Sequence, residues 1–210
     1  MSDDKIRISL TDFMEFSMRS GTPRLTKVAE IKNRLAYDPT TDYWKKLRDR
    51  ICELHEAGDF DIQELKRFAE SYPYAKKVRN YLSAVKGYSR YMRGKTTSWF
   101  VPPTGFWSPS RLQVRINPEV GLVTGGQRLV IKFYFKAERL SKAKIDMMTY
   151  LLRHQLQAAE PEASFAVLDM PKGRLHLASE ERDLAPLLVG EAAAFVAMWD
   201  GLAASRSDAA

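Results

Sequence analysis

The chain has 210 residues, of which 45% are hydrophobic and 28% are charged, and this balance is typical of a folded domain and excludes an intrinsically disordered chain. Its single cysteine, Cys52, excludes an internal disulfide, and the first residues, MSDDKIRISL, lack the apolar run of a secretory signal. The longest apolar run, AAAFVAMW, is much shorter than the roughly 18 residues of a membrane span, so we expect a soluble, cytoplasmic protein with no membrane contact.

The net charge of +7 is unevenly distributed along the chain. Residues 1–75 hold 13 Lys or Arg and 14 Asp or Glu, residues 76–153 hold 16 and 3, and residues 154–210 hold 4 and 9, which gives net charges of −1, +13 and −5. Solvated surfaces usually mix the two signs, whereas residues 76–95 contain no acid. This favours a polyanionic partner, unless the acidic last block folds back and neutralises the basic centre.

The first 72 residues predict four helices, each with a recognisable start or stop. Ser9 and the Asp-Ile-Gln-Glu capping box at 61–64 begin two of them, and Pro23 stands at the first helical position of another. The first two could form a DNA-binding helix-turn-helix, but the neutral charge of the block does not favour it. The expected ranges are about 9–19, 22–35, 41 or 42 to 58, and a short helix from 61.

The next predicted helix, residues 74–93, has one apolar stripe for the core and a cationic exposed side. An irregular loop follows at 94–110, rich in proline, glycine and aromatic residues, and such loops often carry function. The basic residues of this region are Lys76, Lys77, Arg79, Lys86, Arg90, Arg93 and Lys95.

The strongest strand signal is a β-hairpin over residues 112–136 with a turn at Gly125-Gly126, where positive φ angles are needed. Alternation places Lys132, Tyr134 and Lys136 on one face of the second strand and larger apolar residues on the other. This register pairs residue 121 with 130 and 124 with 127, and Glu119 then faces Lys132.

After the hairpin, Ser141 caps a helix that continues to about residue 156, and two short strands flank a turn at 170–173. A last helical region runs from 183 to 202 with an interruption near Gly190, and the tail 204–210 should be flexible. These elements predict an α+β fold, in which an N-terminal helical module (1–72) precedes a small mixed sheet, the hairpin plus further strands, flanked by helices.

From residue 74 the order of elements is helix, loop, hairpin, helix, strand, strand, and over about residues 74–177 it resembles the PD-(D/E)XK nuclease-like superfamily, in its RecB-type branch. The resemblance implies a PD-(D/E)XK-like core with a C-terminal helix over residues 73–203. In that family an acidic residue on one strand and a Glu-x-Lys on the next hold a divalent metal. The match places Glu119 at the first carboxylate and Lys136 at the lysine.

The chain departs from the family at Tyr134, which stands where the second carboxylate belongs. Glu138 could replace it only if the strand bulged, and a single carboxylate holds Mg²⁺ poorly. The resemblance therefore implies a catalytically inactive core without a metal or cofactor, and a live Mg²⁺-dependent nuclease using Glu119 and Lys136 is the alternative. The histidines at 55, 154 and 176 have no metal-ligand spacing.

We therefore expect DNA or RNA to bind mainly through phosphates, with exposed aromatic side chains stacking on bases. Structural interpretations stay open: the loop aromatics could form a small core, and Glu119 and Lys132 could be an ion pair on a half-exposed sheet face. A third hypothesis is a protein-interaction subunit of a bacterial complex with an acidic partner. The candidate nucleic-acid contacts are Lys76, Lys77, Arg79, Lys86, Arg90, Arg93, Lys95, Trp99, Arg115, Lys132 and Tyr134.

Overall fold

The computed structural model describes residues 5–34, 42–58, 60–179 and 182–207. Within these ranges it contains seven helices and two sheets, which confirms the predicted α+β fold. The helices are α1 (Leu10–Ser17), α2 (Thr22–Lys32), α3 (Lys45–Glu56), α4 (Ile62–Glu70), α5 (Ala75–Met92), α6 (Lys142–Leu156) and α7 (Ala185–Ser207). The strands are β1 (Ile6–Ser9), β2 (Ser98–Phe100), β3 (Gly105–Trp107), β4 (Leu112–Ile116), β5 (Val120–Thr124), β6 (Gln127–Tyr134), β7 (Ala163–Asp169) and β8 (Arg174–Leu177).

The larger sheet has five strands in the order β2-β5-β6-β7-β8. Its only parallel pair is β6 with β7, within the part of the chain that is described, and the other neighbours are antiparallel. The β5–β6 hairpin has the predicted register, with Gly121 opposite Val130 and Thr124 opposite Gln127. Gly125 and Gly126 have φ angles of 55° and 79°, as the two-residue turn requires.

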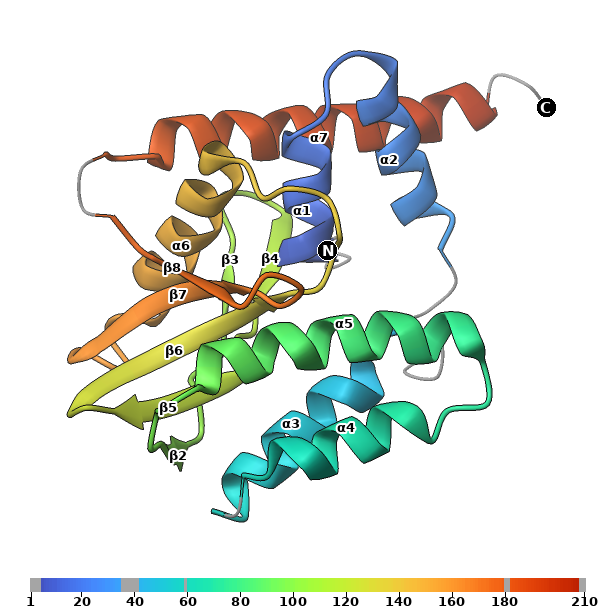
Figure 1. The fold of residues 1–210 in the computed structure, drawn as a ribbon. Coiled ribbons are helices and arrows are strands. Elements are labelled where there is room, and N and C mark those ends of the chain that lie inside the picture. The colour runs from blue at the N-terminus through green and yellow to red at the C-terminus, as the bar shows by residue number, and fades with distance from the viewer. Residues whose placement is uncertain (1–4, 35–41, 59, 180–181, 208–210) are drawn as a thin grey trace.

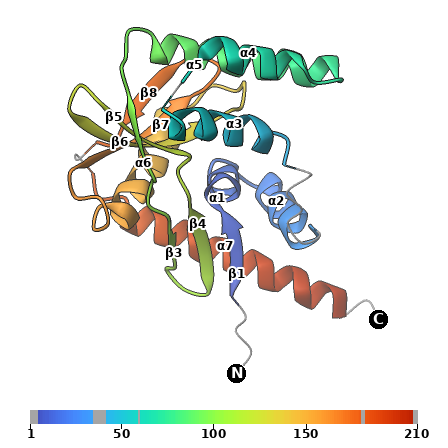
Figure 2. The ribbon, with the colours of Figure 1, turned by 90° about the horizontal axis from the view of Figure 1, so that it is seen from below.

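The smaller sheet has the order β1-β4-β3, and Figure 2 shows these three strands side by side. The observed strands correct three expectations from the sequence. The predicted first hairpin strand is two strands in different sheets, β4 and β5, because Pro118 between them lacks the N–H that a continuous ladder needs. The predicted irregular loop 94–110 contains β2 and β3, and β1, which pairs in parallel with β4, falls within a segment expected to be helical.

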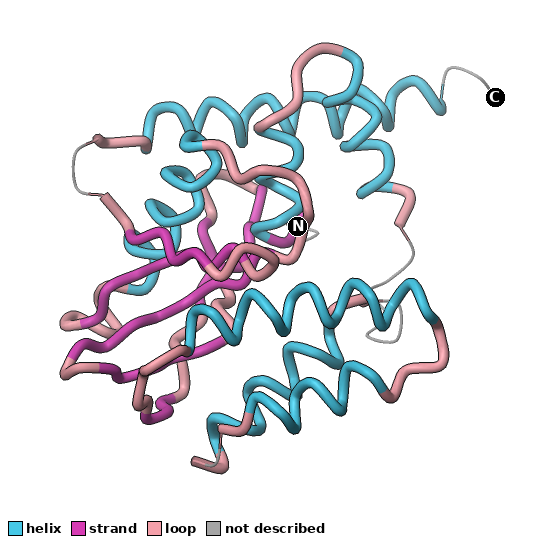
Figure 3. Tube along the Cα trace, viewed as in Figure 1, coloured by secondary structure: helices cyan, strands magenta, loops and turns pink. Residues whose placement is uncertain are grey.

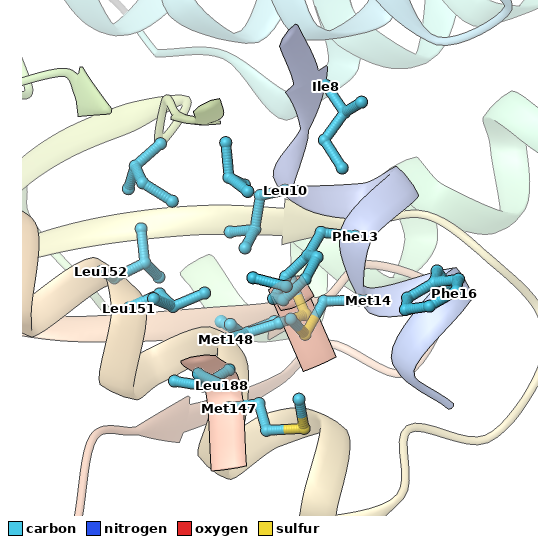
Figure 4. Packing of buried hydrophobic residues seen from close by; sticks show 14 of the residues in the cluster. Ile8, Leu10, Phe13, Met14, Phe16, Met147, Met148, Leu151, Leu152 and Leu188 are labelled. Carbon is cyan, nitrogen blue, oxygen red and sulfur yellow. The ribbon is translucent and has the colours of Figure 1, made fainter. Parts of the chain in front are cut away.

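Two hydrophobic cores cover the two faces of the five-stranded sheet. Figures 1 and 3 show the helices that lie over each face. The first core lies under α1, α2, α6 and α7, and the second lies against α3, α4 and α5. The side chains of β6 alternate between them as predicted: Val130 and Tyr134 enter the first core, whereas Ile131 and Phe133 enter the second. Figure 4 shows Leu10 of α1 and Leu152 of α6 within the first core.

Helices α1 and α4 begin where the capping signals predict, whereas α3 begins at Lys45 rather than at residue 41 or 42. The Ser9 side chain accepts a hydrogen bond from the Asp12 N–H at 3.0 Å, and Asp61 accepts one from the Gln63 N–H at 2.8 Å. Residue 41 and the predicted helix end near residue 35 lie outside the described residues. The predicted module 1–72 supplies α1 and α2 to one core and α3 and α4 to the other, and its independent folding stays a prediction.

Helix α7 corrects two expectations at the C-terminal end. It is continuous through Gly190, and its residues 185–202 are long and apolar enough to cross a membrane by length and composition alone. One side of α7 packs in the first core through Leu188, Ala192 and Phe195, while most of its surface is exposed. The helix extends to Ser207, and the remainder of the predicted tail lies outside the described residues.

Candidate nucleic-acid interface

Helix α5 is held in place by its apolar side. Tyr81, Val85 and Tyr88 are buried in the second core, so the predicted apolar stripe does face the interior. The Tyr88 hydroxyl lies 2.6 Å from the His55 Nε2 on α3, and this contact ties the two helices together. Helix α5 ends at Met92, and Gly94 follows with a φ of 70°, which favours glycine.

The turn between β7 and β8 packs directly on the middle of α5. A Cβ atom added at Gly87 would lie 1.7 Å from the Met170 carbonyl oxygen, so only glycine lets the turn approach this closely. The Arg90 guanidinium donates a hydrogen bond to the Pro171 carbonyl oxygen at 2.6 Å. Helix α5 is therefore fixed by a helix on one side and by a sheet turn on another.

The exposed side of α5 carries a line of cations. Five exposed cations lie three, seven, four and three positions apart along the helix, so they fall on one stripe of its surface. The exposed Ser83 occupies the stripe within the seven-residue gap. The stripe extends about 25 Å, because a helix rises about 1.5 Å per residue. No carboxylate of the described residues forms an ion pair with any of the five. This basic stripe consists of Lys76, Arg79, Lys86, Arg90 and Arg93.

The other two predicted cations of this region are engaged with aromatic rings. The Lys77 ammonium lies 4.6 Å from the centre of the Tyr72 ring and 5.3 Å from that of Tyr81, so this half-buried side chain packs rather than projects. Lys95 is exposed, but its ammonium donates to the Tyr91 carbonyl oxygen and lies 4.6 Å from the Tyr91 ring centre. Lys95 is therefore held in a defined position at the end of α5.

Trp99 and Arg115 lie apart from the basic stripe in the fold. Trp99 is half-buried on β2 and packs against the second core, and its indole Nε1 is buried without a hydrogen-bond partner among the described residues. Arg115 is exposed on β4, which belongs to the three-stranded sheet. Both positions stay predictions as contact residues, and neither extends the stripe.

Lys132 and Tyr134 do not lie on an accessible sheet face, and that expectation is wrong. Lys132 is 6% exposed and Tyr134 is 4% exposed, because α1 and α6 cover this face of β6. The Tyr134 hydroxyl donates to the Glu138 carboxylate at 2.7 Å. Burial, and to a smaller extent this hydrogen bond, raises the pKa of Tyr134. Neither side chain is available to a nucleic acid in this fold.

Glu119 forms the predicted ion pair with Lys132, but in a buried rather than half-exposed setting. The Lys132 ammonium donates to the Glu119 Oε1 at 2.6 Å and to the Asn117 carbonyl oxygen at 2.8 Å. The Glu119 Oε2 accepts the Phe133 N–H at 2.5 Å. This carboxylate supplies an acceptor to the Phe133 N–H of β6 beside the start of β5. Both oxygens of Glu119 are therefore engaged in holding the sheet together.

Lys136 is bonded to Glu15 on α1, so the structure does not join it to Glu119. The lysine bonded to Glu119 is Lys132, and two positions before it stands Val130; two positions before Lys136 stands Tyr134. Neither register supplies a second carboxylate. In the described ranges, no three His, Cys, Asp or Glu side chains gather as a metal site would require.

A charged network between α1 and α2 was not predicted. The buried Lys27 ammonium lies 3.1 Å from Asp12 and 2.8 Å from Glu15, and Arg34 pairs with Asp12 at 3.0 Å. Burial alone would raise the pKa of Asp12, but the Arg34 hydrogen bond and the Lys27 charge outweigh it and lower that pKa to about 2. The three-residue spacing of Asp12 and Glu15 places both on one helix face, but no sequence signal identifies their partners.

Helix α7, which belongs to the acidic C-terminal block, does not cover the basic stripe. Helix α7 lies on the opposite side of the five-stranded sheet from α5 (Figure 1). Its acids pair elsewhere, Asp200 with Arg111 and Glu191 with Arg24, and Glu160 pairs with Arg128 at 2.8 Å. Among the described residues, acids of this block pair with Arg111 and Arg128 of the basic centre, and none pairs with a cation of the basic stripe.

No protein-family model matches the chain, and no curated protein matches its sequence.

Proposed function

We propose that this protein binds nucleic acid through the phosphates, using the basic stripe of α5. The observation that carries the proposal is a row of five exposed cations, about 25 Å long, without a carboxylate partner among the described residues. Each cation that contacts a phosphate releases condensed counterions. A row of cations at fixed positions can therefore contact several phosphates of one strand at the same time. The packing of α5 against two neighbours keeps the row straight in the free protein.

The proposed binding does not discriminate between sequences. The stripe contains only Lys, Arg and the small Ser83, and the one amide nearby, Asn80, donates its side-chain N–H to the Tyr43 hydroxyl at 2.9 Å. Contacts to phosphate fix position but carry no base information. We therefore propose a DNA- or RNA-binding protein that recognises the backbone, and that works in the cytoplasm without a membrane partner.

The nuclease-like resemblance is supported by the order of elements. Helix α5, the strands β2, β5 and β6 of the larger sheet, helix α6 and strand β7 occur in this order along the chain, with β3 and β4 of the smaller sheet between β2 and β5. The proposal of an inactive core is supported by the missing second carboxylate at Val130 or Tyr134 and by the two bonded oxygens of Glu119. The core would then serve as a scaffold for α5 rather than as a metal-dependent enzyme.

The test measures the affinity of the full chain for labelled DNA and RNA by fluorescence anisotropy across a salt series, with and without Mg²⁺. In the triple variant Lys76→Ala, Arg79→Ala, Lys86→Ala, the slope of log Kd against log salt should fall by about three, which is about one for each lost phosphate contact. The matched control, Arg7→Ala, Arg19→Ala, Arg182→Ala, removes the exposed Arg7 and Arg182 and the half-buried Arg19, all outside α5, and should keep the original slope.

Three results would count against the proposal. Equal slopes in the two triple variants would remove the stripe as the binding surface. Absence of binding at about 50 mM salt, where phosphate contacts are strong, would favour an acidic protein partner instead. Cleavage of the probe with Mg²⁺, abolished in Glu119→Gln, would show a live nuclease.

A further inference from the structure

A hollow lies beside the C-terminal end of the basic stripe. Helices α4 and α5 run side by side in opposite directions (Figure 1), so the start of α4 meets the end of α5. Between them is an open hollow of about 310 Å³. Small-molecule sites in proteins usually begin at about 300 Å³, so the hollow has room for one ligand of nucleotide size.

We propose that this hollow binds one unpaired nucleotide of a single-stranded segment, with its base against Phe60 and its phosphate at Arg93 and Lys95. The inference rests on the proposed function and specifies single-stranded nucleic acid. The backbone of the strand would follow the basic stripe, and one unpaired base would turn away from its neighbours into the hollow. A base paired in a duplex could not enter, because its faces and edges are already covered.

The apolar wall of the hollow is a fixed aromatic surface. Phe60, Ile62 and Met92 line it. The Phe60 ring is stacked on the His55 ring, with centroids 4.3 Å apart and planes 12° apart, and Tyr88 meets it edge-on at 5.6 Å. A ring held in this way can stack on a base with little loss of side-chain freedom, and stacking accepts any base because each has a π-face.

The rim of the hollow is cationic on the α5 side and acidic on the α4 side. Arg93 is exposed and has no carboxylate partner within the described ranges, and Lys95 is fixed by the Tyr91 carbonyl group. On the other side, the Asp61 carboxylate accepts the Gln63 N–H at 2.8 Å and lies 3.7 Å from Arg67. A phosphate is therefore attracted to the α5 side, and the base is left to the wall at Phe60.

The experiment compares two labelled single strands of equal length and equal charge, one of thymidine nucleotides and one fully abasic. The full chain should bind the base-containing strand roughly tenfold more tightly, which is within the range for one stacked base. Phe60→Leu removes the ring and keeps an apolar side chain, and Ser89→Leu fills the hollow from the α5 side; both should reduce this ratio towards one.

The matched control is Tyr74→Leu, which removes a 71% exposed aromatic at the other end of α5 and should leave the ratio unchanged. Equal binding of the two strands by the unmodified chain would overturn the hollow and leave the stripe intact. A ratio that survives both hollow variants, or falls only in Tyr74→Leu, would also overturn it. Failure of both strands to bind at about 50 mM salt would instead contradict the proposed function.

Discussion

At the scale of single residues, Glu119, one of the two candidate catalytic residues, has a structural role in a buried ion pair with Lys132. Glu119 and Lys132 have side chains that are 8% and 7% exposed, and each is satisfied by the other and by a backbone group. A buried charge is costly unless it is paired and hydrogen-bonded. The pair joins β6 to the segment before β5 through the Phe133 N–H and the Asn117 carbonyl oxygen, and a substitution at either position would leave an unpaired charge in the interior.

His55 is a second buried polar residue, and it predicts how stability depends on pH. Burial lowers the pKa of His55 from 6.5 to about 4, so below pH 6.5 the unfolded chain binds a proton that the folded chain does not. Stability is therefore fully present above pH 6.5 and falls as the pH is lowered to 4, by about 2–3 kcal/mol, since one pKa unit corresponds to about 1.4 kcal/mol. Urea unfolding at pH 7.5, 6, 5 and 4 measures this loss.

The control for this prediction is a pair of histidine variants. His55→Gln removes the titrating group and should reduce the loss of stability between pH 6.5 and 4, whereas His154→Gln, at an exposed position on α6, should keep the original profile. A smaller loss should remain in His55→Gln, because burial also lowers the pKa of His176. Parallel profiles for the unmodified chain and His55→Gln would contradict the assignment. Below pH 4, Asp12 continues the trend, because its pKa is lowered to about 2 and its stabilising charge is lost as the pH falls through that value.

At the scale of elements, the position of α5 depends on Gly87, because a side chain there would collide with the β7–β8 turn. The β7–β8 turn lies against the helix at Gly87, and Arg90 bonds to the same turn. The turn and the tyrosines of the apolar side together fix the direction of the stripe. A shift of the turn away from α5 would therefore loosen the surface that we propose for phosphate binding.

Gly87→Ala should lower the melting temperature, although alanine is the better helix former by about 1 kcal/mol. The new Cβ would meet the backbone oxygen of Met170, which cannot rotate away, and overpacking of this kind costs about 1–3 kcal/mol. The matched control is Gly190→Ala in α7, where nothing lies within 4 Å of the added atom, so it should be neutral or stabilising. Equal thermal unfolding curves for the two variants would contradict the close packing.

At the scale of the whole molecule, the N-terminal third is divided between the two cores. Helices α1 and α2 cover one face of the five-stranded sheet and α3 and α4 cover the other, and β1 is a strand of the smaller sheet. Much of the buried apolar area on each face therefore involves residues before the predicted boundary at residue 72. The two predicted parts share their interior instead of meeting at a surface.

A chain that starts at residue 73 should therefore fail to fold cooperatively. It lacks Leu10, Phe13 and Phe16 from the first core and Leu47 and Ile51 from the second, all fully buried. We expect a broad thermal transition by circular dichroism and binding of a hydrophobic dye, in contrast to the sharp transition of the full chain. A sharp transition in the fragment would show that the core folds alone and would support the boundary at residue 72.

The features that could be predicted from the sequence have local signals. The hairpin register follows from Gly125-Gly126 and from the alternation along β6, and the helix starts follow from capping residues such as Ser141, which accepts the Lys144 N–H at 3.2 Å. The stripe on α5 follows from helical periodicity. The contacts that could not be predicted join distant segments, as Lys136 does with Glu15, because no pattern within either segment specifies the other.

The parallel pairing of β1 with β4 has a consequence for the order of events during synthesis. Ile6 pairs with Leu112, so β1 is synthesised about a hundred residues before the strand with which it pairs. At about 5–20 residues per second, this interval is about 5–20 seconds. During that time Ile6 and Ile8, which are buried in the finished protein, are exposed beside the apolar face of α1. Strand β1 therefore stays without its partner strand during synthesis until β4 has been made.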